Sequence, residues 1–460
     1  MDGANIQHLL AMILYMLAVI AIGIVFARRA NKDAEAYFLG GRSLGPWVTA
    51  FSAEASDMSG YLLMGLPGLA YWTGLADAGW TCIGLALGTY LNFLITSRRL
   101  RRYSIAVDAF TVPDFFSKRY HEGKHKTLMM LSSLIIIIFF SVYAAQCLST
   151  CGKLFANLFG LSYQSMMIVA AAFVLIYTFL GGFLAESASD FMQAVVMVTV
   201  LVLILIMSVG AAGGLSAAIQ HAEGIDGFFS LVQSAAPSAT EVDVFGAAKP
   251  YGVLSIVSCL AWGLGYFGMP QVLLRFMGIR SEKELKLSRR VAIVWVVISM
   301  AVAVFIGIVG HAVSNVGRIP MLEGSATETV IVRLSDLLSS YGLLPAIVAG
   351  CILAGILAAT MSTADSQLLA AASAFSENVL QDVFGVKLTS KQNMLAARLT
   401  VVVIAFIAIF LAADPNSNVF KIVSFAWAGF GATFGPAVLF ALFWRRSNRQ
   451  GVLAGLVAGG

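Results

Sequence analysis

Charged residues are scarce in this sequence. Asp, Glu, Lys and Arg make up 12% of its 460 residues, whereas hydrophobic residues make up 59%. A soluble domain carries about 25% charged residues. Together with a mean hydropathy of +0.87, this scarcity excludes an ordinary soluble protein and indicates an integral membrane protein.

Cysteine is rare as well, and the signature of an ATP-binding loop is missing. The five cysteines lie in or beside apolar stretches, and none forms a CxxC pair, which argues against a zinc site and a disulfide framework. No GxxxxGK[ST] loop occurs, so we expect no ATP-driven transport within this chain. A membrane enzyme would need a recognisable set of nucleophile or metal-ligating residues, and we find none. We predict that the chain is not an enzyme and needs no cofactor.

Long apolar runs are what the sequence has instead. A helix of about 20 apolar residues crosses the hydrocarbon core of a bilayer, and the runs lack the alternating pattern of a transmembrane barrel. The first run is too long for the apolar core of a signal peptide. A last run begins at Gly451 and is too short to span, so we expect the natural chain to continue beyond Gly460. Eleven transmembrane helices are predicted, at 6–28, 46–72, 76–97, 127–149, 162–184, 191–213, 252–274, 291–313, 343–370, 395–413 and 418–444.

Basic residues collect in the loops on one side of these helices. Examples are the pairs Arg28 and Arg29, Arg289 and Arg290, and Arg445 and Arg446. Such an excess marks the cytoplasmic side, so we predict that the amino terminus and the loops 214–251 and 314–342 lie outside. The net charge of +5 therefore gives no reason to expect a nucleic-acid partner. We interpret the basic clusters as topology signals, with recognition of anionic lipid as the alternative.

The helices after the first divide into two sets of five, which predicts an inverted repeat. An odd number of helices in each half makes the second half enter the membrane from the opposite side. The first helix of each half is rich in Gly and Pro, as SAEASDMSGYLLMGLPG at 52–68 and AWGLGYFGMPQ at 261–271. Glycine and proline destabilise helices, so both should unwind and offer free backbone groups as ligands. The predicted segments are an extra helix and loop at 1–45, repeats at 46–213 and 252–444, an outer loop at 214–251, and the start of a truncated helix at 445–460.

Two carboxylates lie inside the first broken helix. An aspartate at mid-bilayer costs roughly 2.5–3.5 kcal/mol and usually marks an ion or solute pathway, so Asp57 is the main candidate; its alternative role is a helix cap. Glu54 lies three residues earlier and could be a proton site beside Asp57. Equally, Glu54 could be solvated near the cytoplasmic surface or paired with Arg42.

Hydroxyls and further carboxylates lie on other helices. Ser362 and Thr363 offer oxygen ligands of the kind that hard cations prefer, although such hydroxyls often bond to their own helix. Glu186 and Asp190 fall in the predicted loop after the helix 162–184. They lie in a solvated loop or line an inner vestibule, which Asp365 could extend.

Aromatic residues lie in or beside the broken and central helices. Tyr143, Trp262, Tyr266 and Phe267 could form the wall of a pocket for a small, mostly apolar ligand. For Tyr143 and Trp262, ordinary packing is an equally good interpretation of the sequence.

Four long segments, taken together and in order, resemble the sodium/solute symporter family, and within it the sodium/proline symporters. They are GGRSLGPWVTAFSAEASDMSGYLLMGLPG at 40–68, WGLGYFGMPQVLLRFM at 262–277, LAATMSTADSQLL at 357–369 and VSFAWAGFGATFGPAVLF at 423–440. The resemblance covers essentially the whole chain. It implies an all-α LeuT-type fold, with two inverted five-helix repeats preceded by one helix, that works by alternating access.

The resemblance also implies roles for particular residues. The sodium site would take backbone carbonyls of Ala55, Met58 and Ala359 and side-chain oxygens of Ser362 and Thr363, with Asp57 needed for sodium binding. Asp190 would lie on the sodium exit path, and Arg42 would support coupling. The proline site would involve Ser56, Ser59, Gly60, Tyr143, Trp262, Tyr266 and Pro270.

The expected function is therefore sodium-driven uptake of L-proline across a bacterial plasma membrane, with no obligatory protein partner. One alternative keeps the fold and carries another small organic solute. Another couples transport to protons through Glu54, a charged residue where a small one would also fit the family pattern. A channel would need a continuous polar pore, and a membrane sensor would need a soluble output domain; neither is evident.

Overall fold

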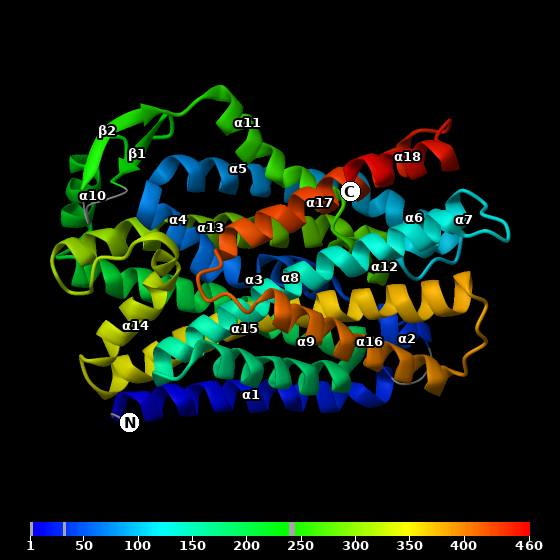
Figure 1. Cartoon of the computed structure of the whole chain (residues 1–460), viewed down its shortest axis with the longest axis horizontal. Helices are drawn as coiled ribbons and strands as arrows, with labels where there is room; N and C mark the ends of the chain where they lie inside the picture. Colours follow the sequence, from blue (N-terminus) through cyan, green and yellow to red (C-terminus); the bar gives the residue numbers. More distant parts are fainter. Residues whose placement is uncertain (1–2, 31–33, 239–243) are drawn as a thin grey trace.

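The computed structural model describes residues 3–30, 34–238 and 244–460 and shows a bundle of helices that run along its long axis (Figure 1). Small parts of the predicted extra-helix segment, residues 1–2 and 31–33, and of the predicted outer loop, residues 239–243, lie outside the described residues. The first half contains α1 (Gly3–Ala30), α2 (Ala34–Leu39), η1 (Gly40–Arg42), α3 (Pro46–Gly60), η2 (Tyr61–Gly65), α4 (Leu66–Thr73), α5 (Leu75–Leu91), η3 (Asn92–Thr96), α6 (Ser97–Ala106), α7 (Val112–Arg119), α8 (Thr127–Phe159) and α9 (Tyr163–Ala211).

The second half follows a connecting segment that holds α10 (Leu215–Gly224), β1 (Gln233–Pro237) and β2 (Phe245–Pro250). Its elements are α11 (Val253–Ala261), η4 (Trp262–Phe267), α12 (Pro270–Gly278), η5 (Glu282–Glu284), α13 (Leu285–Asn315), η6 (Gly324–Thr329), α14 (Val330–Ser339), α15 (Leu343–Ser373), η7 (Ala374–Val383), α16 (Ser390–Leu411), α17 (Val419–Phe443) and α18 (Arg449–Gly459). Helix α15 lies at the centre, packed against α9, α8, α3 and α1.

The predicted helical spans are helical in the structure. Within the described residues, seven helices are long and apolar enough to cross a membrane, and the bent pair Val253–Phe267 and Pro270–Gly278 makes an eighth span. The three remaining predicted spans correspond to α1, to the broken α3–η2–α4 segment and to the first part of α9. The prediction of an all-α membrane protein is confirmed.

The first broken helix unwinds at Ser59, whose backbone (φ 51°, ψ −163°) is not helical. A wide turn, η2, follows, and the chain becomes α-helical again at Leu66. Pro67 falls in the first turn of α4, where its missing N–H breaks no helical bond. The break therefore lies before the Pro-Gly pair rather than at it.

The second broken helix bends by 44° between η4 and α12. Pro270 is the first residue of α12, which again places a proline where a helix begins. The glycines here allow close helix approach: a Cβ at Gly263 would lie 1.9 Å from the carbonyl oxygen of Gly84 on α5. Both predictions of unwinding in the Gly-rich helices are confirmed.

One predicted loop is wrong. The spans expected at 162–184 and 191–213 belong to a single element, α9, which breaks only at Gly182 (φ 58°, ψ 179°). Glycine adopts this conformation without a steric penalty, so one residue suffices for the turn. Residues 185–190 continue the second helix, and Glu186 and Asp190 are buried rather than solvated.

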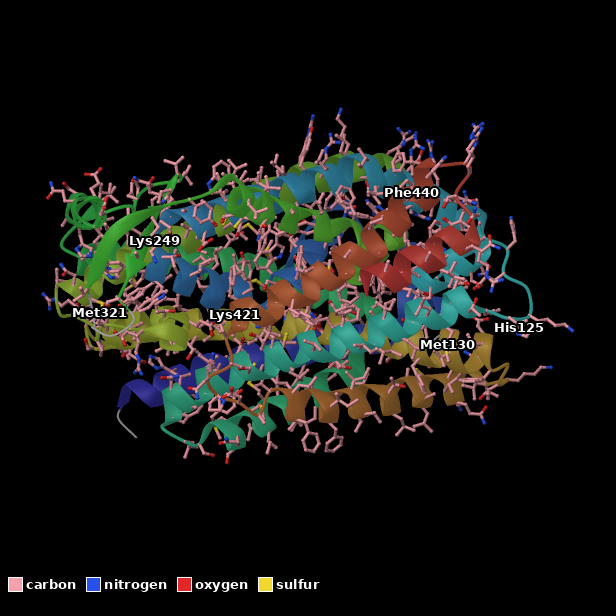
Figure 2. All side chains as sticks on the ribbon, turned by 45° about the horizontal axis from the view of Figure 1, so that its top comes forward. His125, Met130, Lys249, Met321, Lys421 and Phe440 are labelled. Atoms are coloured by element: carbon pink, nitrogen blue, oxygen red, sulfur yellow. The ribbon has the colours of Figure 1, made fainter. Side chains whose placement is uncertain are left out.

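The two ends of the bundle differ. Strands β1 and β2 pair antiparallel, with Gln233 opposite Pro250, and with α10 and α14 they lie at the left end in Figure 1, where α1 begins. The basic helix α6 and helix α7 lie at the opposite end. Figure 2 shows the same separation, with Lys249 and Met321 at one end and His125 at the other.

Candidate ion and solute site

A cluster of carbonyl and hydroxyl oxygens forms where α15 crosses the break in α3. The Ser362 hydroxyl donates to the carbonyl of Ala55 at 2.8 Å and to that of Ala359 at 3.0 Å. The Thr363 hydroxyl lies within 3.3 Å of the Ala55 carbonyl and 3.2 Å of the Ala359 carbonyl. All four residues are fully buried. The structure thus brings together four of the five residues that the family resemblance implies as direct oxygen ligands.

The fifth, Met58, lies one turn further along α3, beside the break. Its carbonyl accepts the backbone N–H of Tyr61. The Ser59 hydroxyl accepts the same N–H at 3.1 Å. Ser59, rather than Asp57, therefore supplies the side-chain oxygen that caps the turn after the break.

Asp57 and Glu54 are buried side by side on α3. Glu54 is 0% exposed, so its interpretation as a solvated surface residue is wrong. Its Oε2 lies 3.5 Å from the Tyr266 hydroxyl. Within the described residues, both carboxylate oxygens of Asp57 and Oε1 of Glu54 lack a hydrogen bond of normal geometry. Because unpaired buried carboxylates are costly, this pocket favours a cation or a proton.

Several predicted solute residues meet on the other side of Asp57. Tyr143 on α8 donates its hydroxyl to the Asp57 carbonyl at 2.5 Å and lies 3.5 Å from the Ser59 hydroxyl. Trp427 on α17 donates its indole N–H to the Tyr143 hydroxyl at 3.3 Å and packs edge-on against Tyr266, with ring centroids 4.9 Å apart. Trp427 was not singled out in the sequence.

Trp262 extends this aromatic group. Its ring lies 4.9 Å from Phe420 and 5.5 Å from Tyr61. Within the described residues, the Trp262 indole N–H and the Tyr61 hydroxyl are buried without a partner. Gly60 lies so close to α8 that a Cβ would meet Thr150 Oγ1 at 2.5 Å.

Two predicted solute residues are directed elsewhere. The Ser56 hydroxyl donates to the carbonyl of Ala53 on its own helix at 3.1 Å. Pro270 is buried as the first residue of α12, where it shapes the backbone at the second break.

Arg42, the predicted coupling residue, lies away from this cluster. It donates to the carbonyls of Ala109 at 2.7 Å and Met277 at 3.1 Å, and these bonds tie η1 to α12 and to the segment after α6.

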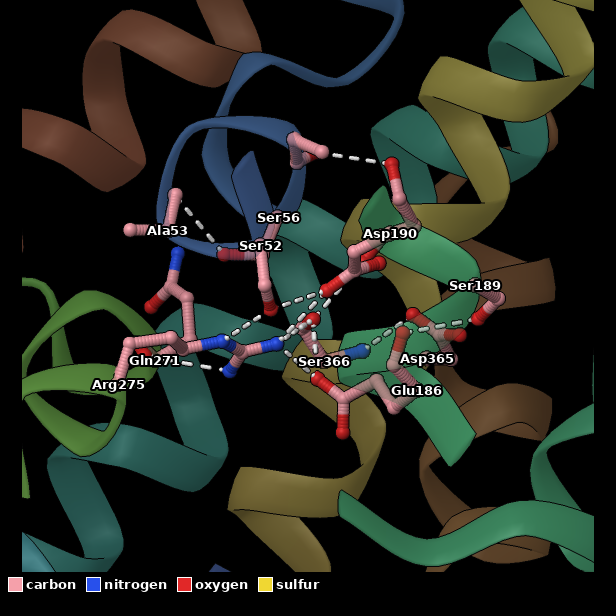
Figure 3. Close-up of polar contacts among 12 residues, drawn as sticks. Ser52, Ala53, Ser56, Glu186, Ser189, Asp190, Gln271, Arg275, Asp365 and Ser366 are labelled. Atoms are coloured by element: carbon pink, nitrogen blue, oxygen red, sulfur yellow. Dashed lines mark hydrogen bonds and ion pairs between the residues drawn. The ribbon is translucent and has the colours of Figure 1, made fainter. Parts of the chain in front are cut away.

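A buried arginine network closes the side of the site toward α6 (Figure 3). Arg275 on α12 donates to Ser52 Oγ at 2.9 Å, Ser366 Oγ at 2.8 Å and Asp190 Oδ2 at 3.1 Å, and it pairs with Glu186. Arg275 is 1% exposed. The network joins α3, α9, α12 and α15. Its signal in the sequence was a lone arginine within an apolar stretch, a pattern that marks functional sites in membranes.

A second buried ion pair lies toward the opposite end. Lys153 Nζ on α8 lies 2.8 Å from Glu328 Oε2 and 2.6 Å from the Ser417 carbonyl, and Glu328 Oε1 accepts the backbone N–H of Phe420. Glu328 belongs to η6, which packs on Gly68 of α4. Buried charge networks thus lie on both sides of the broken helices.

Two short matches to enzyme motifs have the wrong structure for catalysis. The HExxH match at 121–125 lies in a turn, whereas metal binding by that motif needs a helix; Glu122 instead accepts the backbone N–H groups of Leu128 and Met129. The GxSxG match at 41–45 runs from the end of η1 into the segment before α3, where Ser43 donates to the Gly40 carbonyl. Across the described part of the chain, no group of three or more His, Cys, Asp or Glu residues is arranged to hold a metal.

Comparison with models of known protein families identifies the family of this chain. The model of the sodium:solute symporter family matches residues 37–459. The chain belongs to this family. It is therefore a transporter rather than an enzyme, and it belongs to a family of sodium-coupled symporters.

Similar curated proteins include two proline transporters. The chain is 39% identical over 456 residues to the osmoregulated proline transporter OpuE of Bacillus subtilis (strain 168), covering 99% of this chain and 87% of the relative. It is 39% identical over 460 residues to the sodium/proline symporter of Staphylococcus aureus (strain USA300), covering 99% of this chain and 85% of the relative.

Solved structures share the fold. A substrate-bound, outward-open structure of a sodium-coupled sialic acid symporter superposes with a TM-score of 0.77 at 19% identity, over 98% of this chain and 90% of the other. MhsT in complex with L-phenylalanine superposes with a TM-score of 0.59 at 14% identity, over 89% and 91% of the two chains. The predicted LeuT-type fold is confirmed.

Proposed function

We propose that this symporter couples inward movement of sodium to uptake of L-proline across a bacterial plasma membrane by alternating access. The observation that carries the proposal is the convergence of α15 hydroxyls on the Ala55 carbonyl beside the buried carboxylate of Asp57. An inside-negative potential adds about 2.3 kcal/mol per charge per 100 mV to such uptake.

Sodium fits the chemistry of the cluster. It is a hard cation, and by the logic that governs calcium and magnesium it prefers oxygen ligands. In the proposed site the carbonyls of Ala55, Met58 and Ala359 and the hydroxyls of Ser362 and Thr363 bind the ion. Asp57 supplies the nearby negative charge, and the ion in turn offsets the cost of burying that charge.

L-Proline is the solute suggested by the names of both relatives, and the aromatic group supports it. The pyrrolidine ring would lie against Trp262 and Tyr266. Backbone N–H groups at the break near Ser59 and Gly60 would bind the carboxylate, as amino termini of half-helices do. The Trp262 N–H and the Tyr61 hydroxyl, both buried without a described partner, are two further donors for it.

The two charge networks supply the gates. Release toward the α6 end requires Arg275 to separate from Asp190 and Ser52, which opens a route for sodium past Asp190. Movement at the opposite end requires Lys153 to release Glu328. In the predicted orientation the amino terminus and the β-hairpin lie outside, and the Arg275 network is the cytoplasmic gate.

The test is uptake of labelled L-proline into proteoliposomes under an inward sodium gradient, a proton gradient or neither. Accumulation with sodium alone supports the proposal. Uptake driven by protons assigns coupling to Glu54, which is buried beside Asp57. Uptake of other small solutes but not of proline would refute L-proline as the transported solute and would leave the fold assignment unchanged.

A further inference from the structure

An apolar slot opens on the side of the helix bundle, between α3, α9 and α13. It encloses about 310 Å³, and its lining includes Trp47 and Phe51 of α3, Val198 of α9, and Val294 and Trp295 of α13. Binding pockets for small molecules range from about 300 to 1,000 Å³. The slot is therefore large enough to hold part of an acyl chain.

The slot is held in shape by contacts behind it. The indole N–H of Trp295 donates to the Ala194 carbonyl on α9 at 3.0 Å. Phe51 packs edge-on against Phe191, with ring centroids 5.2 Å apart. Trp295 is only 5% exposed, whereas Trp47 and Val294 are 51% and 57% exposed. The slot thus has a buried floor and an exposed apolar rim on the side of a helix bundle that would face the bilayer.

One end of the slot is positively charged. Arg290 lines it, and Lys286 lies four residues earlier on α13, one helical turn away on the same face. Both are exposed. The acidic residues of this segment are already paired, Glu282 with Arg102 and Glu284 with Arg280. Within the described residues, neither Lys286 nor Arg290 forms an ion pair.

We propose that this slot binds an anionic phospholipid, with an acyl chain between Trp47 and Trp295 and the phosphate at Arg290 and Lys286. The chemistry selects this occupant because the rim opens sideways to the bilayer and because, among the residues that the structure describes, the charged residue that lines the slot, Arg290, is a cation. Basic pockets between helices on the cytoplasmic side bind anionic head groups, and the basic end of this bundle is the predicted cytoplasmic end. The inference does not depend on the transported solute.

Native mass spectrometry of the purified full chain tests it, with phosphatidylglycerol and phosphatidylcholine of identical acyl chains as probes. Each basic residue near the membrane surface strengthens attraction to anionic lipid roughly fivefold. The wild type should retain phosphatidylglycerol over phosphatidylcholine, and the double variant Lys286→Gln, Arg290→Gln should lower that preference roughly tenfold or more. The matched control is Lys387→Gln with Lys391→Gln, which removes two exposed lysines, also four apart.

A second variant fills the slot without changing charge. Val294→Trp should displace the lipid, whereas Val403→Trp, at a residue that is likewise 57% exposed, should not. The site is supported if phosphatidylglycerol retention falls in the Lys286, Arg290 double variant and in Val294→Trp but in neither control. The proposal would be overturned if the double variant kept the wild-type preference for phosphatidylglycerol, or if the lysine control lost as much of that preference. Either result would indicate non-specific attraction of anionic lipid.

Discussion

Asp57 is the residue on which the account depends most. Its carboxylate is buried without a described hydrogen-bond partner, two residues after Ala55, whose carbonyl lies against the Ser362 and Thr363 hydroxyls of α15. We expect Asp57→Ala to abolish sodium-dependent uptake while the protein still folds, because the variant removes charge and fills no new space. Uptake and circular dichroism of the purified variant check this; wild-type sodium affinity would refute the role.

Thr363 offers a milder test of the same site. Its hydroxyl lies 3.3 Å and 3.2 Å from two carbonyls that belong to the proposed ligand set. Hydrogen bonds and contacts to charged groups contribute about 1.5–3 kcal/mol. Thr363→Ala should therefore raise the sodium concentration for half-maximal uptake by roughly tenfold or more. Proline affinity at saturating sodium should change much less, and an equal loss of both affinities would count against an ion site here.

Glu54 separates the two coupling ions. Glu54→Gln keeps the size of the side chain and its contact with Tyr266 but removes the acidic proton. If sodium drives transport, uptake under a sodium gradient should remain close to that of the wild type. Measurement under a proton gradient completes the test, since proton-driven uptake that disappears in the variant would favour coupling through Glu54.

At this scale the prediction of the ion ligands depended on the family resemblance of long motifs. Ser362 and Thr363 meet Ala55, 307 and 308 positions away, as that resemblance implied. Arg275, Lys153 and Trp427 were missed. Arg275 contacts Glu186, which lies 89 positions away in the chain, and the spacing of residues carries no record of that pairing. Glu54 was misjudged as a candidate for solvation because depth within a broken helix cannot be counted from the sequence.

At the scale of helices, the Arg275 network holds four elements together, and its loss should loosen them. Removing one partner of a buried ion pair costs about 3–5 kcal/mol, because the other charge remains buried. We expect Arg275→Gln to lower the thermal midpoint and to expose the part of α9 beside the network, on the predicted cytoplasmic side. Arg275→Lys should reduce both effects.

Maleimide labelling of Cys introduced at Ala185, a fully buried position on α9, measures this exposure in a background without the five native cysteines. Labelling should rise with Arg275→Gln. It should stay low with Arg318→Gln, which removes an exposed arginine just after the last residue of α13, far from the network in the chain. Equal labelling in the two variants would show that the network is no gate.

The position of the helix breaks shows what patterns can and cannot predict. Glycine and proline content predicted which two helices unwind. It did not predict that unwinding begins at Ser59. The Ser59 hydroxyl accepts the backbone N–H of Tyr61, and glycine and proline content carries no information about such a side-chain cap. The fusion of two predicted helices into α9 was missed because a single glycine, Gly182, makes the turn that a loop was expected to make.

For the whole molecule, the LeuT-type fold places the two broken helices between two closed charge networks. Residues from α3 and α15 meet at the ion cluster, and residues from α3, α8, η4 and α17 meet at the aromatic group. Ion and solute would therefore share α3 and its break. Such sharing predicts reciprocal coupling, in which each ligand binds better to the state that the other stabilises.

The most direct measurement is equilibrium binding of labelled L-proline to the purified protein across a series of sodium concentrations, repeated with Asp57→Ala. The account predicts that sodium tightens proline binding severalfold, that proline tightens sodium binding by the same factor, and that the variant loses both effects. Proline affinity that is the same with and without sodium would contradict it.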